Sequence, residues 1–114
     1  MMALLMGVKT ISPDGVHRLA QNPEHVTIID VNSRQSWSKA RVPGARHLDA
    51  AEYQEKDLPA DKGSLLVFYC SNSMCRKAPN AARRAKRLGY TDVRVMSAGI
   101  SGWVAAKMPT ESGE

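Results

Sequence analysis

One stretch of the chain, residues 65–88, fixes the kind of fold that the rest must complete. Residues 65–69 form a short apolar run that predicts a buried strand. A polar loop follows at 71–76, and residues 78–88 mix alanines with basic side chains as an amphipathic helix does. Gly89 stands where a helix ends. A strand, a loop and a helix in this order indicate one unit of a parallel sheet.

Cys70 lies at the junction between this strand and its loop. The helix that follows offers unpaired N–H groups and a partial positive charge, which favour the reactive thiolate form. Small or polar loop residues let backbone amides curl around an anion. That loop consists of Ser71, Asn72, Ser73, Met74, Cys75 and Arg76. The pattern predicts either a nucleophile at Cys70 with an anion-binding loop or a buried cysteine that only packs.

Strands and helices alternate along the rest of the chain, so we expect an α/β fold. The β-branched run at 26–31 indicates a strand buried on both faces, as in a parallel sheet. Further strands are expected at 10–11, 45–48 and 92–96, and helices at 13–20, 33–39, 49–53 and 99–107. The prediction is a central parallel β-sheet of about five strands with helices on both faces.

The length of 114 residues suits one domain, which we place at 9–109 between a leader at 1–8 and a tail at 110–114. The leader is apolar but short, and no segment approaches the roughly 20 apolar residues that span a membrane. Two cysteines are too few for a disulfide scaffold. We therefore expect a cytoplasmic protein with reduced thiols and no membrane partner.

The net charge of +5 arises from 16 basic and 11 acidic residues, and much of the excess lies within 76–87. These side chains form either a solvated helix face or a positive field that concentrates small anions near the loop. Nucleic acid is not expected as a partner because the chain is poor in the aromatic residues on which bases stack. The Cys70 and Cys75 spacing and the scattered histidines predict no metal site.

Four segments carry a resemblance to a known family: 28–31, 42–45, 69–90 and 98–103. Taken in order, they resemble the rhodanese-like sulfurtransferase family, single-domain type, over residues 26–109. The resemblance implies that Cys70 attacks the outer sulfur of thiosulfate or a similar donor and retains it as a persulfide stabilised by amides of 71–76. Cyanide, a cellular thiol or a sulfur-relay protein would then take the sulfur, and no cofactor is implied.

The chain departs from the family pattern at several positions. Asn32 and Ser36 stand where the family usually has Arg and Glu, and Ala40-Arg41 stands where Gly-His is common. These family residues brace the structure, so we expect the fold to persist with different local contacts.

Two features keep other functions open. Cys70-x5-Arg76 fits the pattern of cysteine phosphatases and arsenate reductases of the same fold, in which arginine clamps an oxyanion. Tyr69 argues against that function, since those enzymes resemble one another in having His before the cysteine. A sulfur carrier or interaction module without catalysis is the third alternative. Cys75 is either an inert thiol or a resolving thiol, which a curled loop could bring within disulfide range of Cys70.

Overall fold

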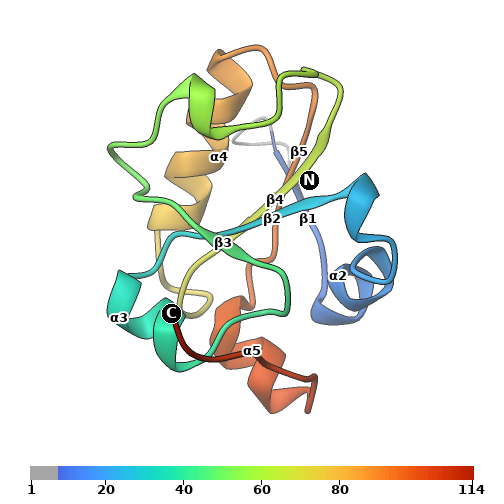
Figure 1. The fold of residues 1–114 in the computed structure, drawn as a ribbon, viewed down its shortest axis with the longest axis vertical. Coiled ribbons are helices and arrows are strands. Elements are labelled where there is room, and N and C mark those ends of the chain that lie inside the picture. Colours follow the sequence, from blue (N-terminus) through green and yellow to red (C-terminus); the bar gives the residue numbers. More distant parts are fainter. Residues whose placement is uncertain (1–7) are drawn as a thin grey trace.

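A five-stranded parallel sheet organises the computed structural model, which describes residues 8–114 (Figure 1). The strand order is β1-β5-β4-β2-β3, and every neighbouring pair is parallel. The strands are β1 Lys9–Thr10, β2 Thr27–Asp30, β3 Arg46–His47, β4 Leu65–Tyr69 and β5 Asp92–Val95. This architecture confirms the predicted α/β fold and its number of strands. Residues 1–7, most of the expected leader, lie outside the described part of the chain.

Four α-helices and two short 3-10 helices connect the strands. They are α2 Pro13–Leu19, η1 Pro23–His25, α3 Arg34–Lys39, η2 Glu55–Asp57, α4 Lys77–Arg87 and α5 Gly99–Ala105. The predicted helix at 49–53 is wrong. The Asp49 carboxylate accepts hydrogen bonds from Ala51 N–H and Glu52 N–H and holds a turn instead. The other predicted helices are present, each with ends within two residues of those expected.

Helix ends follow local sequence chemistry. The Ser12 hydroxyl caps α2 by accepting from Gly15 N–H, and Ser33 caps α3 in the same way. Gly89 follows α4 with a φ of +105°, a left-handed conformation that glycine adopts without strain. The sequence therefore sets where α4 ends, and with it how far its basic face extends.

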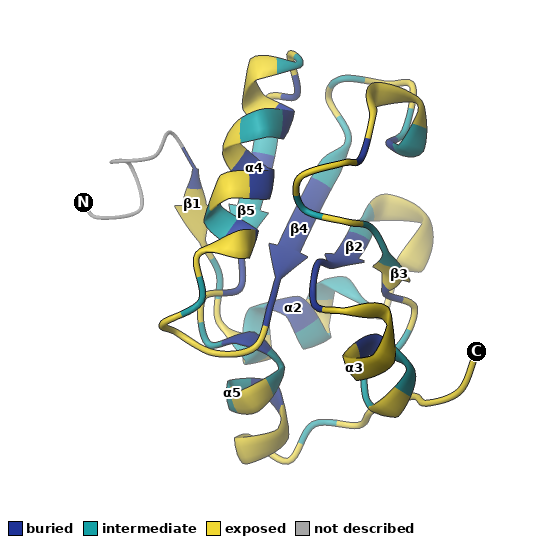
Figure 2. Ribbon diagram, turned by 90° about the vertical axis from the view of Figure 1, so that its left-hand side faces the viewer, coloured by how far each residue is buried: buried dark blue, intermediate teal, exposed yellow. Residues whose placement is uncertain are grey.

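The sheet is covered on both faces, and β4 shows how (Figure 2). Leu66 and Phe68 pack against the alanines of α4 in one core, whereas Val67 and Tyr69 pack on the other face with Trp103 of α5. This alternation is the two-residue period of a strand. The next residue, Cys70, belongs to the α4 side by the same period.

The C-terminal segment, residues 111–113, packs against α3 and against Arg41, which follows α3 closely in the chain. Arg41 and Glu111 exchange backbone hydrogen bonds of 2.9 Å in each direction, and Gly113 N–H donates to Ser38 O at 2.7 Å. The guanidinium of Arg41 stacks over the ring of Trp37, 3.9 Å from its centroid, and donates to Gly113 O. These contacts join residues 111–113 to the body of the fold.

None of the helices within residues 8–114 has the length and apolar character needed to cross a membrane. Over the same residues, no group of three or more His, Cys, Asp and Glu side chains is arranged to hold a metal ion.

Candidate active site at the end of β4

Cys70 follows β4 directly, at the edge of the sheet where all the parallel strands end. Ligand sites of open parallel sheets lie at this edge. The side chain points towards α4 and is 3% exposed. Its Sγ accepts a hydrogen bond from Ala78 N–H at 3.4 Å. Ala78 belongs to the first turn of α4. Backbone N–H groups there have no partner within the helix, and this is the positive end of the helix dipole.

Cys70 is joined to Cys75 by a disulfide, with the two Cα atoms 6.4 Å apart. The structure thus shows the oxidised form of the pair, whereas we expected both thiols to be reduced. The local reason is a tight turn: Cys75 N–H donates to Asn72 O at 3.1 Å, and Met74 N–H donates to the Asn72 side chain at 2.9 Å. The turn folds the chain back, which brings position 75 within disulfide range of position 70.

The expected ring of loop amides around Cys70 takes a different form in this oxidised state. The N–H groups of Met74 and Cys75 donate to Asn72, and the N–H group that donates to the Cys70 sulfur is that of Ala78. Met74 is 83% exposed and does not line the cavity described next. Both cysteines line a cavity of about 40 Å³, together with Asn72, Ser73, Ala78, Pro79, Val95, Met96 and Ser97.

Arg76 is exposed at the residue that precedes α4, and Lys77 is its first residue. Neither side chain forms an ion pair with another residue of the described part of the chain. The first turn of α4 contains no acidic residue. Two positive charges at the positive end of the α4 dipole destabilise the helix. An anion bound near the loop would offset that repulsion, so the arrangement favours one.

The N-terminus of α5 holds the loop from the opposite side. Ile100 N–H donates to Cys70 O and Ser101 N–H donates to Ser71 O, both at 2.9 Å. Gly99 has a φ of +69°, and a Cβ placed there would lie 2.6 Å from Asn72 N. The loop thus packs directly on the α5 backbone. Sequence analysis used this segment for a predicted helix and a family resemblance and missed this role, although a glycine at the start of a helix was a usable signal.

Asn32 ties the end of β2 to the same loop. Its side chain accepts from the Ser71 hydroxyl at 3.1 Å, and its carbonyl lies 2.7 Å from His47 Nε2. Asn32 N–H donates to the carboxylate of Asp30 at 2.8 Å. The sequence singled out Asn32 only as a departure from the family. Its place after the strand next to β4 is the signal that could have linked it to the site.

Asp30 is fully buried beneath this link. Its Oδ2 atom has no hydrogen-bond partner among the described residues, while Oδ1 accepts from Asn32 N–H. Burial raises the pKa of Asp30, although the hydrogen bond from Asn32 N–H and the neighbouring Tyr69 hydroxyl act in the opposite direction. The carboxyl therefore binds a proton more readily than an exposed aspartate does.

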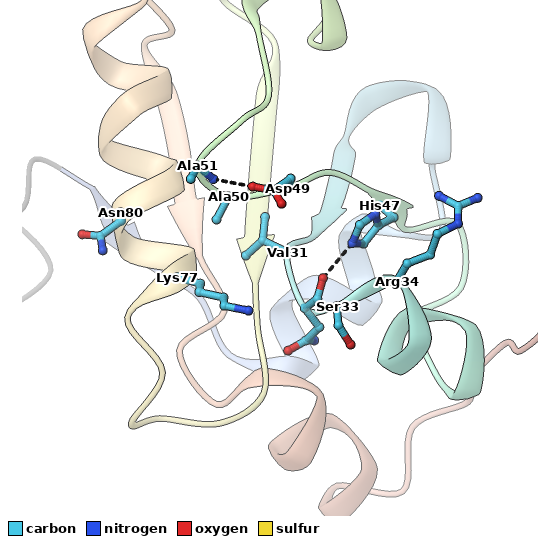
Figure 3. A pocket seen from close by; sticks show the side chains of 10 residues that line it. Val31, Ser33, Arg34, His47, Asp49, Ala50, Ala51, Lys77 and Asn80 are labelled. Atoms are coloured by element: carbon cyan, nitrogen blue, oxygen red, sulfur yellow. Dashed lines mark hydrogen bonds between the residues drawn. The ribbon is translucent and has the colours of Figure 1, made fainter.

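A cleft of about 580 Å³ opens beside the loop, between α3 and the start of α4 (Figure 3). Arg34, His47 and Lys77 contribute basic groups to it, and the Asp49 carboxylate is occupied by two backbone amides. Its other lining residues are Val31, Asn32, Ser33, Ala50, Ala51 and Asn80. The cleft has the size of a small-molecule site and a basic rim suited to an anion.

A comparison with known families agrees with this geometry: the Rhodanese-like domain matches residues 12–106. The chain belongs to the rhodanese-like domain family. The rhodanese-like domain has solved relatives as well, among them the BH2092 protein of Bacillus halodurans. That structure superposes with a TM-score of 0.82 at 19% identity, over 91% of this chain and 77% of the other, which supports the fold.

Two relatives in sequence have different names. The HTH-type transcriptional regulator Rv0324 of Mycobacterium tuberculosis is 30% identical over 90 residues, which are 77% of this chain and 38% of that protein. The chain thus spans well under half of that regulator's length. The thiosulfate sulfurtransferase GlpE of Haemophilus influenzae is 23% identical over 107 residues, covering 94% of this chain and 98% of that enzyme.

Proposed function

We propose that this rhodanese-like domain is a sulfurtransferase that carries a sulfane sulfur on Cys70. The observation that carries the proposal is the position of Cys70 Sγ, which accepts the Ala78 N–H at the positive end of α4. A thiol held at such a place ionises readily, and an ionised thiol is the nucleophile that sulfur transfer requires. The similarity to a thiosulfate sulfurtransferase adds support.

The reaction starts from the reduced Cys70–Cys75 pair. The Cys70 thiolate attacks the outer sulfur of thiosulfate, the sulfur–sulfur bond of thiosulfate breaks, and sulfite leaves with the bonding electron pair. A persulfide remains on Cys70, where the N-terminal amides of α4 stabilise its negative charge. In the second half-reaction an acceptor thiolate or cyanide attacks the outer sulfur and restores the Cys70 thiolate.

The donor in this proposal is a small anion such as thiosulfate, which the unpaired charges of Arg76 and Lys77 attract. The acceptor is a cellular thiol or a sulfur-relay protein. We place the protein in the cytoplasm, because a nucleophilic thiolate must be kept reduced.

Mass spectrometry of the intact protein tests the proposal. The Cys75→Ser variant is reduced with dithiothreitol, freed of reductant without oxygen, and mixed with thiosulfate. We expect it to gain one sulfur atom while sulfite is released, and to lose that sulfur to cyanide as thiocyanate. Cys70→Ala should gain nothing. A Cys75→Ser protein that stays unmodified, despite an intact fold by circular dichroism, would contradict the proposal.

The Cys70-x5-Arg76 spacing favours a second candidate, a phosphatase or arsenate reductase. Against it, Arg76 is exposed, and the residue before the nucleophile is a buried tyrosine whose hydroxyl accepts from Val42 N–H. Hydrolysis of an aryl phosphate or thiol-dependent reduction of arsenate by the same reduced protein would favour this candidate. Sulfur loading from a cysteine desulfurase but not from thiosulfate would indicate a carrier.

A further inference from the structure

We propose that Cys75 discharges the Cys70 persulfide as hydrogen sulfide, so that the domain also acts as a thiosulfate-reducing, sulfide-releasing enzyme. This inference rests on the proposed function, since it needs the persulfide as its substrate. It goes beyond sulfur transfer because the sulfur leaves as free sulfide and is not handed to an acceptor.

The disulfide itself shows which sulfur Cys75 can reach. Its Sγ is bonded to Cys70 Sγ, the atom that becomes the inner sulfur of the persulfide. The turn around Asn72 and the two α5 amides hold the loop in this conformation. Cys75 is also partly buried and packs against the core on the α4 side, so its position is fixed by the fold.

The cavity that both cysteines line suits a small leaving group. Its volume of about 40 Å³ exceeds the roughly 10–15 Å³ needed to hold a water molecule, so one hydrosulfide ion can be accommodated. The hydroxyl-bearing residues Ser73 and Ser97 line it and can donate hydrogen bonds to such an anion.

Cys75 also lies in a basic part of the loop. It directly precedes Arg76 and Lys77, whose side chains have no acidic partner within the described residues. The second nucleophile is therefore supplied by the same basic loop that serves the first.

The step balances without any further reactant. The Cys75 thiolate attacks the inner sulfur, a Cys70–Cys75 disulfide forms, and the bond between Cys70 and the outer sulfur breaks. The outer sulfur leaves with the electron pair as hydrosulfide. Two protein thiols are oxidised by two electrons, and the sulfane sulfur is reduced to sulfide. A dithiol reductant, such as dithiothreitol or a protein with a C-x-x-C pair, then reopens the disulfide for the next cycle.

A single-turnover experiment without reductant tests this reaction. Wild-type protein is reduced, freed of reductant without oxygen, and mixed with thiosulfate. We expect one sulfide per protein, the loss of both titratable thiols, and an intact mass two hydrogen atoms below that of the reduced form. Cys75→Ser should release only background sulfide and keep its added sulfur. Val104→Ala, at an exposed position of α5 that does not line this cavity, is the control and should still release sulfide.

The outcomes separate the two proposals. If Cys75→Ser gains sulfur but the wild-type protein releases no sulfide, or holds the sulfur as a persulfide on Cys75, the inference is overturned and the proposed function stands. Equal sulfide release from wild type and Cys75→Ser would also overturn it. If Cys75→Ser gains no sulfur, the proposed function itself fails.

Discussion

Asp30 is a buried carboxyl group placed one strand away from the candidate nucleophile. Its Oδ2 atom lacks a hydrogen bond within the described structure, and burial raises its pKa above the ordinary value of 3.8. In the interval between those two pKa values the folded protein binds more protons than the unfolded chain. The stability that Asp30 contributes is therefore complete below the ordinary value and is lost as the pH rises through the raised one.

Replacing Asp30 with asparagine should remove this pH dependence. Asparagine keeps an acceptor for Asn32 N–H but carries no titrating charge. We expect the free energy of unfolding of Asp30→Asn to rise relative to wild type as the pH increases from about 4 to about 8. Urea unfolding across this range measures the difference, and parallel curves for the two proteins would contradict the expectation.

Tyr69 and Tyr53 form a matched pair of buried hydroxyls with different partners. The Tyr69 hydroxyl accepts from the buried Val42 N–H at 3.0 Å, so Tyr69→Phe strands a donor and should cost about 1–3 kcal/mol. The Tyr53 hydroxyl donates to Ala81 O at 2.7 Å. That carbonyl lies within α4 and keeps its helical bond, so Tyr53→Phe should cost only about 0.5–1.5 kcal/mol. Urea unfolding of both variants checks this order, and equal losses would speak against it.

The contact between α5 and the thiol loop is the element on which the site depends. Gly99→Ala would place a Cβ 2.6 Å from the loop backbone at a φ of +69°. The conformation alone costs roughly 1–3 kcal/mol, and the overlap forces the loop to move. We expect lower stability and slower persulfide formation in the Cys75→Ser background.

Gly44→Ala is the control for this prediction. Gly44 has a φ of +83°, yet no atom lies within 4 Å of a Cβ placed there. The control therefore has a similar backbone strain without the overlap, and it should lose stability while persulfide forms at the normal rate. If both variants formed persulfide at the same rate, the α5 contact would not position the loop.

Charge acts over the whole molecule. With a net charge of +5, the protein should attract thiosulfate at long range. Salt shortens that range, from about 30 Å at 0.01 M to about 3 Å at 1 M. We expect the rate of persulfide formation from thiosulfate to fall as salt rises, and the rate from an uncharged organic trisulfide to change little. Stopped-flow measurements with both donors test this.

Two lysines locate the origin of the effect. Lys77 lines the cleft beside the loop. Lys9 follows Val8, and Val8 packs on the α4 side of the sheet. Because successive strand residues point to opposite faces, Lys9 lies on the other side of the sheet. Lys77→Gln should flatten the salt dependence, and Lys9→Gln should leave it unchanged. The same slope in both variants would point to net charge alone.

The alternation of strands and helices could be predicted because each element shows the spacing of apolar residues that is typical of its type. The place of Cys70 followed from one rule about parallel sheets. The links that complete the site could not be predicted, because they join distant segments: Ser71 and Asn32 are 39 residues apart. The helix expected at 49–53 failed for the opposite reason, since one side chain, that of Asp49, captured the local amides.

The shortness of the two outer strands affects how the sheet can meet another chain. β1 and β3 are two residues long, and each contains a charged or titratable side chain, Lys9 in one and Arg46 with His47 in the other. An incoming extended chain would find too few open backbone groups there to bind in register. Such borders give edge-to-edge pairing between copies of the chain little to build on, and so disfavour the growth of fibrils.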